Sequence, residues 1–438
     1  MFLLFPNNLF ENLDKNYKYI LYEHPLFFSS NLRVNKFHIQ KLILHRASMK
    51  YFYNNMKKKG YDITYLEFGK KLNKNEITDV FRLTDKELEK EFKYIKNIHE
   101  NPLFLHSIED LKEYKGGLFH HTFKLWSIKK LKLKGLDKSY DSLNRNKLKE
   151  SEIKNIPDFN FETKELDYIN EAKEYVKKFK TYGLLNENFK YPINSEEAFL
   201  VLRKFIKERF VNFGKYQDSI INNNEKNILY HACISSSLNI GLIRVLDVIK
   251  EIEQVKEKIP IESYEGFLRQ IVGWREYMRY CYEFYYDDII KSNYFNNKKK
   301  LPNKWYENNF RTNIEAIDNC LIKVVNTGYL HHIERLMIIL NYMTLLEINP
   351  KDICKWFLSC VSIDAYDWVM VTNVYIFSYA FKEASRKPYI SSSNYVLKMS
   401  NYKKEKWCDV WDNLYRSFLK KKKEKLKGTI YYTQAIKL

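Results

Sequence analysis

The sequence predicts two domains: an α/β N-terminal domain built on a parallel sheet, and an all-α C-terminal domain. The chain has 438 residues, which is more than a single hydrophobic core usually serves. In its first third, short apolar runs alternate with helical patterns, the order expected of a parallel sheet with crossover helices. After residue 196, strand patterns nearly vanish and amphipathic helical patterns take their place.

The N-terminal domain is expected over residues 1–130 and a connector over residues 131–195. The connector is charged, rich in Lys, Glu and Asn, and expected to wrap on the surface. In the N-terminal domain we expect strands at Phe2–Phe5, Tyr19–Glu23 and Ile63–Phe68, and helices at Lys36–Lys59 and Asp85–Ile98.

The C-terminal domain is expected over residues 196–438. Its apolar residues recur at helical spacing, and one long helix is expected to run through Gly328. The expected helices cover Glu197–Phe213, Tyr264–Tyr286, Ile317–Glu347 and Pro350–Phe357.

The composition is strongly basic. Lys and Arg total 74 against 54 Asp and Glu, which gives a formal net charge of +20. Such a charge repels itself unless the partner is a polyanion or an acidic surface, and nucleic acid is the first candidate. A Lys- and Asn-rich composition inherited from an AT-rich genome is the alternative, so the charge alone does not decide.

The sequence lacks the features that identify several common classes of protein. The six cysteines form no C-x-x-C pair, which predicts reduced thiols in a cytoplasmic protein. We find no signal peptide and no apolar run long enough to span a membrane. The sequence also lacks a Walker loop, a G-x-G-x-x-G turn, H-E-x-x-H and G-x-S-x-G, which disfavours the usual kinases, dehydrogenases and hydrolases.

One arginine falls on an apolar helix face. Arg275 lies in a stripe with Leu268, Val272 and Met278. A buried guanidinium needs an anionic partner, either a cofactor phosphate or an internal carboxylate. Because structural ion pairs are common, the pattern by itself favours a carboxylate.

Two adjacent histidines follow Gly328. His332 is in helical register with the apolar residues Val325 and Leu336, and His331 points to one flank. A histidine on an apolar face is usually a satisfied core residue. Two at the mouth of a pocket could instead donate and accept a proton, which suits catalysis on a DNA base.

Two further clusters carry open interpretations. The first is polar and precedes an apolar helix; its hydroxyls and backbone N–H groups could bind a phosphate, although ordinary N-capping fits the spacing better. It consists of Ser235, Ser236, Ser237 and Asn239. The second is aromatic and is either core or able to stack on rings and pass electrons. It consists of Trp356, Phe357, Tyr366, Trp368 and Tyr389.

Motifs spread along nearly the whole chain resemble a known family. It is the bacterial photolyase-related group of the photolyase and cryptochrome superfamily, which includes prokaryotic (6-4) photolyases and iron–sulfur bacterial cryptochromes. The motifs are His38–Leu42, Arg46–Met49, Ser139–Asp141 with Asn144–Arg145, Phe213–Asp218, His231–Gly241, Gly273–Glu276, Gly328–Met337, Asp364–Trp368, Asn373–Val374 and Lys387–Tyr389.

The resemblance implies a Rossmann-like antenna domain followed by a helical FAD-binding domain. It implies light-driven electron transfer from reduced FAD to ultraviolet pyrimidine photoproducts in DNA, preferably of the (6-4) type. The partner is then UV-damaged DNA, bound by a monomer that extrudes the lesion. A cryptochrome-like photoreceptor without repair activity is the alternative, and a flavin-free nucleic-acid-binding module is a third.

The same resemblance implies roles for individual residues. The catalytic residues are His331, His332, Tyr389 and Asp364, and Trp356 transfers electrons. FAD is held by His231, Ser235, Ser236, Asn239, Arg275, Arg335 and Asn373, and the lesion is contacted by Trp274 and Gln270.

The sequence departs from the family at its metal and antenna positions. Lys403–Lys406 stand where the family has a C-x-x-C pair, and Cys320 is out of register with another ligand, so we predict no iron–sulfur cluster and no metal ligands. Phe357 stands at a photoreduction position where some relatives have tyrosine. Asn7 and Phe27 replace acidic antenna residues, which leaves a lumazine-type antenna chromophore open.

Overall fold

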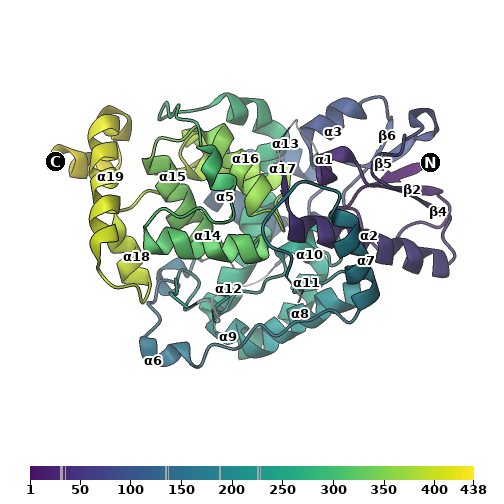
Figure 1. The fold of residues 1–438 in the computed structure, drawn as a ribbon, viewed down its shortest axis with the longest axis horizontal. Coiled ribbons are helices and arrows are strands. Elements are labelled where there is room, and N and C mark those ends of the chain that lie inside the picture. Colours follow the sequence, from purple (N-terminus) through teal and green to yellow (C-terminus); the bar gives the residue numbers. More distant parts are fainter. Residues whose placement is uncertain are drawn as a thin grey trace.

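The computed structural model describes residues 1–29, 33–34, 36–133, 136, 138–186, 189–223, 226 and 228–438. Figure 1 shows the strands and the N-terminus at one end of the molecule, and α19 (Lys406–Lys422) near the C-terminus at the other. Helices fill the space between them. Within the described ranges, every helix is too short or too polar to cross a lipid bilayer.

The N-terminal part contains a five-stranded parallel sheet in the order β4-β2-β1-β5-β6. The central pairing places Leu3 beside Ile20 on one side and Val80 on the other. The three expected apolar runs form three of the strands. The strands are β1 (Phe2–Leu4), β2 (Tyr19–Tyr22), β4 (Ile63–Leu66), β5 (Asp79–Phe81) and β6 (Asn97–His99).

The helix expected over Asp85–Ile98 is wrong in its second half. Asp85 caps the N-terminus of α3 (Lys86–Glu91), because its side chain accepts hydrogen bonds from two backbone N–H groups of the first turn. The helix then ends, and the chain enters β6, which pairs in parallel with β5. The three residues of β6, Asn-Ile-His, form no continuous apolar run that would reveal a strand.

The long crossover helix α2 (Ile39–Lys58) connects the sheet to the rest of the molecule. The connector is docked on it rather than merely wrapped on the surface, since α7 (Leu166–Val176) packs against α2 through buried Ile169 and Ala172. Next to this contact, β3 (Phe37–His38) pairs in parallel with β7 (Thr181–Tyr182).

The remaining chain is helical, as predicted. Pro350 at the first position of α16 and the Asn349 cap before it show why that helix begins there. The helices not yet given are α1 (Pro25–Phe28), α4 (Ile108–Glu113), α5 (His120–Lys130), α6 (Glu150–Ile153), α8 (Ser195–Glu208), α9 (Phe210–Phe213), α10 (Ser235–Ile240), α11 (Val245–Glu253), α12 (Ile261–Leu268), α13 (Arg275–Lys291), α14 (Glu315–Thr327), α15 (Asn341–Leu345), α16 (Pro350–Cys360), α17 (Asp367–Phe377), α18 (Ser393–Met399) and α20 (Ile430–Ile436).

Two π-helical turns interrupt the helical part. One, Arg269–Trp274, joins α12 to α13, and the other, Glu334–Leu340, precedes α15. A π turn holds one more residue than an α turn and is frequent at functional sites.

The single helix expected over Ile317–Glu347 is broken at Gly328. This glycine has a φ of 68°, so it ends α14 in the left-handed conformation that glycine adopts most readily. A Cβ atom at this position would also lie 3.1 Å from the ring of His38. The apolar spacing continues past the break because both pieces bury an apolar face, which explains why the pattern looked continuous.

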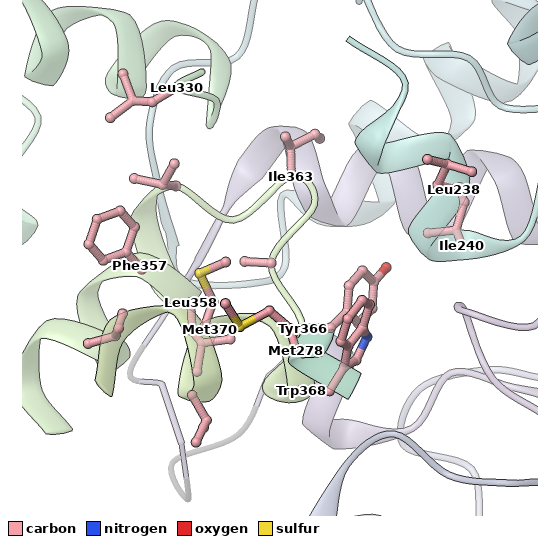
Figure 2. Close-up of a cluster of buried hydrophobic side chains, with 14 of the residues drawn as sticks. Leu238, Ile240, Met278, Leu330, Phe357, Leu358, Ile363, Tyr366, Trp368 and Met370 are labelled. Atoms are coloured by element: carbon pink, nitrogen blue, oxygen red, sulfur yellow. The ribbon is translucent and has the colours of Figure 1, made fainter. Parts of the chain in front are cut away.

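The core is shared by the two parts of the chain. In Figure 2, Leu238 and Ile240 of α10 lie near Trp368 and Met370 of α17 and Met278 of α13. All five side chains are buried, and they belong to one cluster that also includes the strands of the sheet.

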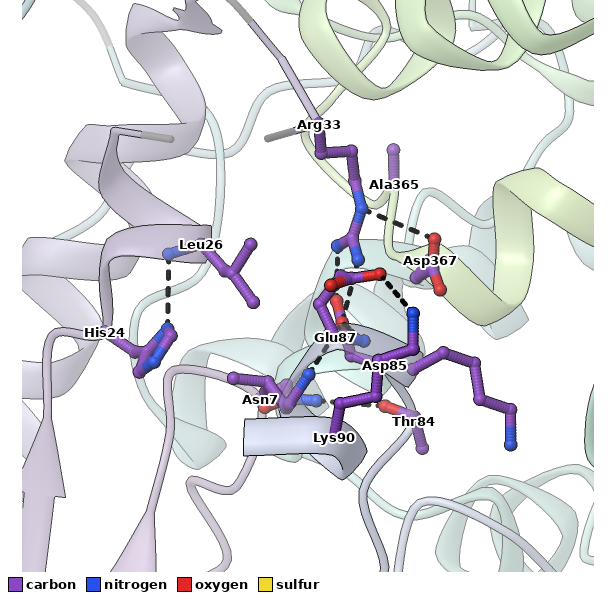
Figure 3. Close-up of polar contacts among 12 residues, drawn as sticks. Asn7, His24, Leu26, Arg33, Thr84, Asp85, Glu87, Lys90, Ala365 and Asp367 are labelled. Carbon is purple, nitrogen blue, oxygen red and sulfur yellow. Dashed lines mark hydrogen bonds and ion pairs between the residues drawn. The ribbon is translucent and has the colours of Figure 1, made fainter. Parts of the chain in front are cut away.

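A buried ion network ties the N-terminus of α17 to the N-terminal part. Figure 3 shows Arg33 between two carboxylates, with NH2 donating to Asp85 Oδ1 at 2.7 Å and Nε lying 3.4 Å from Asp367 Oδ1. The hydroxyl of Tyr282 also donates to Asp367. The start of α17 is therefore fixed by Arg33, which Asp85 holds in turn, and by Tyr282 of α13.

Candidate functional site

A cavity of about 590 Å³ opens among α10, the two π turns, α16 and α17. Its size lies in the range of small-molecule and cofactor sites. It brings together nine residues that the resemblance assigned to flavin or lesion, namely His231, Ser235, Gln270, Trp274, His332, Arg335, Asp364, Asn373 and Tyr389. The other five do not line it: Ser236, Asn239, Arg275, His331 and Trp356.

A second cavity, of about 560 Å³, adjoins the first. The two share Cys233, Ser235 and Tyr329 in their walls, and Ser236 lines the second one. The N-terminal residue of α10 therefore stands at the junction of the two spaces.

Asp364 connects three elements at the wall of the first cavity. Ser235 Oγ donates to Asp364 Oδ2 at 2.6 Å, and Asn239 Nδ2 donates to the Asp364 carbonyl oxygen at 2.7 Å. Arg335 NH2 lies 2.9 Å from the other carboxylate oxygen. The arrangement corrects the capping interpretation of Ser235, because α10 begins after Ile234 without a side-chain cap.

Arg275 lacks the carboxylate partner that its pattern favoured. Its NH1 group donates to Asn239 Oδ1 at 2.6 Å, and NH2 donates to the Leu103 carbonyl at 3.4 Å. Among the described residues, none forms an ion pair with Arg275, and its Nε has no hydrogen-bond partner. Burial lowers the pKa of its guanidinium to about 10. A cation close behind the cavity wall thus has no direct ion pair, and Glu276 and Asp364 stabilise its charge only from a greater distance.

The two histidines have the opposite arrangement to the predicted one. His331 is buried, and its ring stacks on that of His231 with centroids 4.5 Å apart and planes at 20°. His332 is half-buried at the cavity wall, with its side chain 39% exposed and Nε2 3.6 Å from Asp218 Oδ1. The break at Gly328 is the physical reason, since residues beyond it no longer continue the face of α14.

Burial also sets the charge of two of these rings. It is the main cause that lowers the pKa of both His231 and His331 well below the ordinary value, and nearby positive groups such as Lys323 act in the same direction. Both rings are therefore neutral near pH 7, so each retains one unprotonated nitrogen.

On the other side of the cavity, His120 and Phe377 join the predicted Trp274 and Tyr389, and the sequence did not single out either of the two added residues. His120 stacks on Trp274 with centroids 3.6 Å apart and planes at 8°, and burial lowers the pKa of His120 to about 3. Phe377 continues this aromatic wall, with its ring centroid 5.2 Å from that of Trp274 and 5.1 Å from that of Tyr389. His120 comes from α5, too far along the chain for spacing to connect it to Trp274.

Polar residues of the connector also reach the cavity. Asp141 and Arg145 line it, and Arg269 NH1 lies 2.9 Å from Asp141 Oδ1. Both connector residues belong to motifs quoted for the resemblance, so that signal was available.

Trp356 lies outside the cavity wall. It is fully buried, and its Nε1 donates to the Trp305 carbonyl at 3.0 Å. Its neighbour Phe357 lines the cavity, with the two ring centroids 5.3 Å apart.

Comparison with known proteins gives related sequences. The family of deoxyribodipyrimidine photo-lyase-related proteins matches residues 3–124. A (6-4) photolyase of Agrobacterium fabrum is 36% identical over 257 residues, which cover 55% of this chain and 50% of that protein. The chain thus aligns with about half the length of this relative. An uncharacterised protein of Acanthamoeba polyphaga mimivirus, R855, is 49% identical over 104 residues, 22% of this chain and 83% of that protein.

Solved structures with the same fold cover the chain more fully. A class III photolyase from Agrobacterium tumefaciens matches 91% of this chain and 86% of its own, with a TM-score of 0.56 at 14% identity. A Synechocystis cryptochrome matches 98% and 89%, with a TM-score of 0.51 at 12% identity. These matches confirm the predicted fold class, that of photolyases and cryptochromes. The sequence matches add that residues 3–124 fit the photolyase-related family model and that about half of the chain is related to a (6-4) photolyase.

Proposed function

We propose that this protein holds FAD in the two adjoining cavities and repairs ultraviolet pyrimidine photoproducts in DNA under light, with a preference for the (6-4) type. The observation that carries the proposal is the cavity of about 590 Å³ with the half-buried His332 in its wall and Arg275, which forms no direct ion pair, behind it. A relative named as a (6-4) photolyase and a structural neighbour described as holding two FAD molecules support it.

The residues present fit a flavin dinucleotide. Arg275 has a buried Nε without a partner in the described part of the chain, and a diphosphate supplies the missing negative charge. Ser235 at the junction of the cavities and the N-terminus of α10 offer hydroxyl and backbone donors nearby. Arg335, already neutralised by Asp364, holds that carboxylate in place, and Asn373 lines the same cavity.

When bound, the flavin supplies an electron on illumination. In our proposal the chain's own residues bind the lesion and move protons. Trp274 and Gln270 contact the extruded bases beside Tyr389, and the aromatic wall excludes water. His332 donates a proton to the lesion, with Asp218 Oδ1 3.6 Å away to orient its ring. His331 supports it from the buried side, and Trp356 relays electrons toward the cavity.

The net charge of +20 suits a DNA backbone. We propose that the protein binds DNA as a cytoplasmic monomer, because an extruded lesion needs one cavity and one basic surface. A lumazine-type antenna chromophore stays an open part of the proposal.

We also propose that the protein holds no iron–sulfur cluster. Four cysteine ligands would have to converge. Over the described residues, which include all six cysteines, the one group of three or more potential ligands close enough to share an ion consists of histidines.

A visible spectrum followed by a repair assay tests the proposal. The spectrum of the purified chain should show flavin, and photoreduced protein with a lesion-bearing oligonucleotide should remove (6-4) lesions faster than cyclobutane dimers in blue light and not in the dark. Bound flavin without light-dependent loss of either lesion would contradict repair and favour a photoreceptor. A colourless, folded preparation would contradict both and favour a flavin-free nucleic-acid-binding module.

A further inference from the structure

Three histidines from distant parts of the sequence meet behind and at the wall of the first cavity. His231 precedes α10, while His331 and His332 follow Gly328, and one potential ligand atom from each ring lies within 4.8 Å of the other two. We infer that this histidine trio is a binding site for one divalent transition-metal ion of the zinc, nickel or cobalt type. Imidazole is a preferred ligand for these ions, and the trio adds a ligand to the site already described.

Unused ring nitrogens are the second observation behind the inference. Within the described ranges, Nε2 of His231 and both ring nitrogens of His331 are buried without a hydrogen-bond partner. A buried polar atom without a partner costs free energy, so most such atoms in proteins are paired. A coordinated ion accepts the lone pair of one nitrogen on each ring and removes this cost.

Carboxylates lie beside two of the three imidazole rings. Glu334 Oε1 lies 3.5 Å from His331 Nε2, and Asp218 Oδ1 lies 3.6 Å from His332 Nε2. Carboxylates at this position orient ligating imidazoles and raise their basicity. Two of the positive groups nearby already have acidic partners: Lys323 is 2.8 Å from Glu334 Oε2, and Arg335 is 2.9 Å from Asp364 Oδ1. The buried guanidinium of Arg209, which also acts on His231, has no hydrogen-bond or ion-pair partner among the described residues, and an ion at the trio has to tolerate it.

The geometry predicts an exchangeable ion rather than a permanently buried one. An ion lies in the plane of each imidazole that binds it, so His231 and His331 must tilt out of their stack to share one. His332 faces the cavity, which leaves a coordination position open to water. Three protein ligands with an open position are the arrangement of accessible zinc sites. Magnesium, which prefers oxygen ligands, should bind poorly.

The site has a consequence that rests on the proposed function. The nitrogen of His332 that binds an ion is not free to act on a lesion, so zinc should inhibit repair and a chelator should restore it. Metal binding itself requires neither flavin nor DNA.

Metal titration of the untagged, full-length chain tests the site. After treatment with a chelator and dialysis, the protein should bind one zinc ion by equilibrium dialysis, and cobalt should give visible absorption bands of a nitrogen-ligated site. His332→Ala, which removes a side chain that is 39% exposed, should weaken zinc binding at least ~10-fold. His231→Gln should do the same, and circular dichroism checks its fold. His99→Ala is the control, because His99 pairs with Asp79 far from the trio and should leave binding unchanged.

Each contrary result overturns the inference. If the wild-type protein binds no zinc, the trio is not a metal site. The same conclusion holds if a variant with His231 and His332 both replaced binds zinc as tightly as the wild-type protein. Zinc binding that is lost in the His99→Ala control places the ion elsewhere. Failure of the proposed function is separate, since it is detected by flavin absorption and by repair in the presence of a chelator.

Discussion

Two arginines, the buried Arg46 and the half-buried Arg275, have opposite sets of contact partners. Arg46 on α2 is fully paired: NH1 is 2.8 Å from Glu23 Oε1, NH2 is 3.0 Å from Glu67 Oε1, and Nε donates to Glu171 at 3.1 Å. Arg275 at the start of α13 has an amide and a carbonyl as its acceptors and an orphaned Nε. The first guanidinium is neutralised within the protein, and the second is not.

The difference separates a structural role from a binding role. An internal ion cluster such as that of Arg46 holds α2, the sheet and α7 together. A buried cation that the protein does not neutralise costs stability unless a ligand supplies the charge. Both residues lie in motifs that resemble the photolyase-related family, so sequence similarity alone would not distinguish the structural role from the binding role.

The largest expected effect is on stability at Arg46. Arg46→Met should lower the free energy of unfolding by about 3–5 kcal/mol, because it leaves the fully buried Glu23 carboxylate without a counter-ion. Urea unfolding measures the change. The control is Arg203→Met, which removes an exposed pair with Glu251 and should change stability by less than about 1 kcal/mol. Equal, small effects of the two substitutions would show that the cluster does not have the structural role assigned to it.

The next effect concerns the half-buried imidazole of the cavity. His332→Ala should reduce light-dependent repair at least ~100-fold while leaving flavin occupancy unchanged, since it removes a proton donor and no flavin contact. Chromatography of the lesion and the flavin spectrum measure the two quantities, with a chelator present throughout. Repair at the wild-type rate would eliminate a catalytic role for His332.

Substitution of Arg275 should weaken ligand binding more than it lowers stability, the opposite of the effect expected at Arg46. Arg275→Met should weaken FAD binding by roughly 10- to 100-fold, the value of a charge-assisted hydrogen bond, while the flavin-free protein becomes no less stable. Arg335→Met is the matched control, because Arg335 neutralises Asp364 and its loss should destabilise the flavin-free protein. Equilibrium dialysis and urea unfolding measure both. A clear loss of stability in Arg275→Met, with FAD binding unchanged, would show that Arg275 acts through its hydrogen bonds to Asn239 and Leu103 and not through the flavin.

The smallest effect concerns a third cation, the buried Lys41 of α2. Its Nζ donates to the carbonyls of Ser362 and Ala365 and lies 3.9 Å from the ring centroid of Tyr366, and burial lowers its pKa to about 7 from an ordinary value of 10.5. Between these values the unfolded chain binds more protons than the folded one. Stability should therefore rise from pH 7 to pH 9, by no more than about 1.4 kcal/mol per pH unit.

Lys41→Met provides the check on this assignment. Urea unfolding at several pH values should give a flatter dependence for this variant than for the wild-type protein. The same slope in both proteins would show that Lys41 stays protonated in the folded state.

The sequence predicted the fold class and most of the long helices, because apolar runs and helical spacing record which faces are buried. It did not predict β5 or β6, because these short strands, Asp-Val-Phe and Asn-Ile-His, lack the continuous apolar run that revealed the equally short β1. At the site it placed Arg275 on the apolar face of a helix but assigned it the wrong partner. Helical spacing shows which residues share a face of the helix, but not which residues of other elements contact that face. The order of His331 and His332 was wrong for a local reason, the left-handed Gly328.

Contacts between side chains that are far apart in the sequence could not be predicted from the spacing of residues. Nothing in the spacing of His231 predicts its stack on His331, and nothing in α5 predicts the stack of His120 on Trp274. The quoted motifs pointed to the cavity as a whole, whereas its individual contacts depend on the packing of five or more elements.

The π turn Arg269–Trp274 fixes the angular position of the aromatic wall. Removing one residue there would restore ordinary α geometry and rotate everything upstream by about 100° relative to α13. Gln270 would then leave the cavity even though the helix gained regular hydrogen bonds. A shortened chain of this kind should lose its ligands and also turn the buried Tyr264 and Phe267 of α12 out of the core, so the extra residue of the π turn lets one helix face the core and the cavity at once.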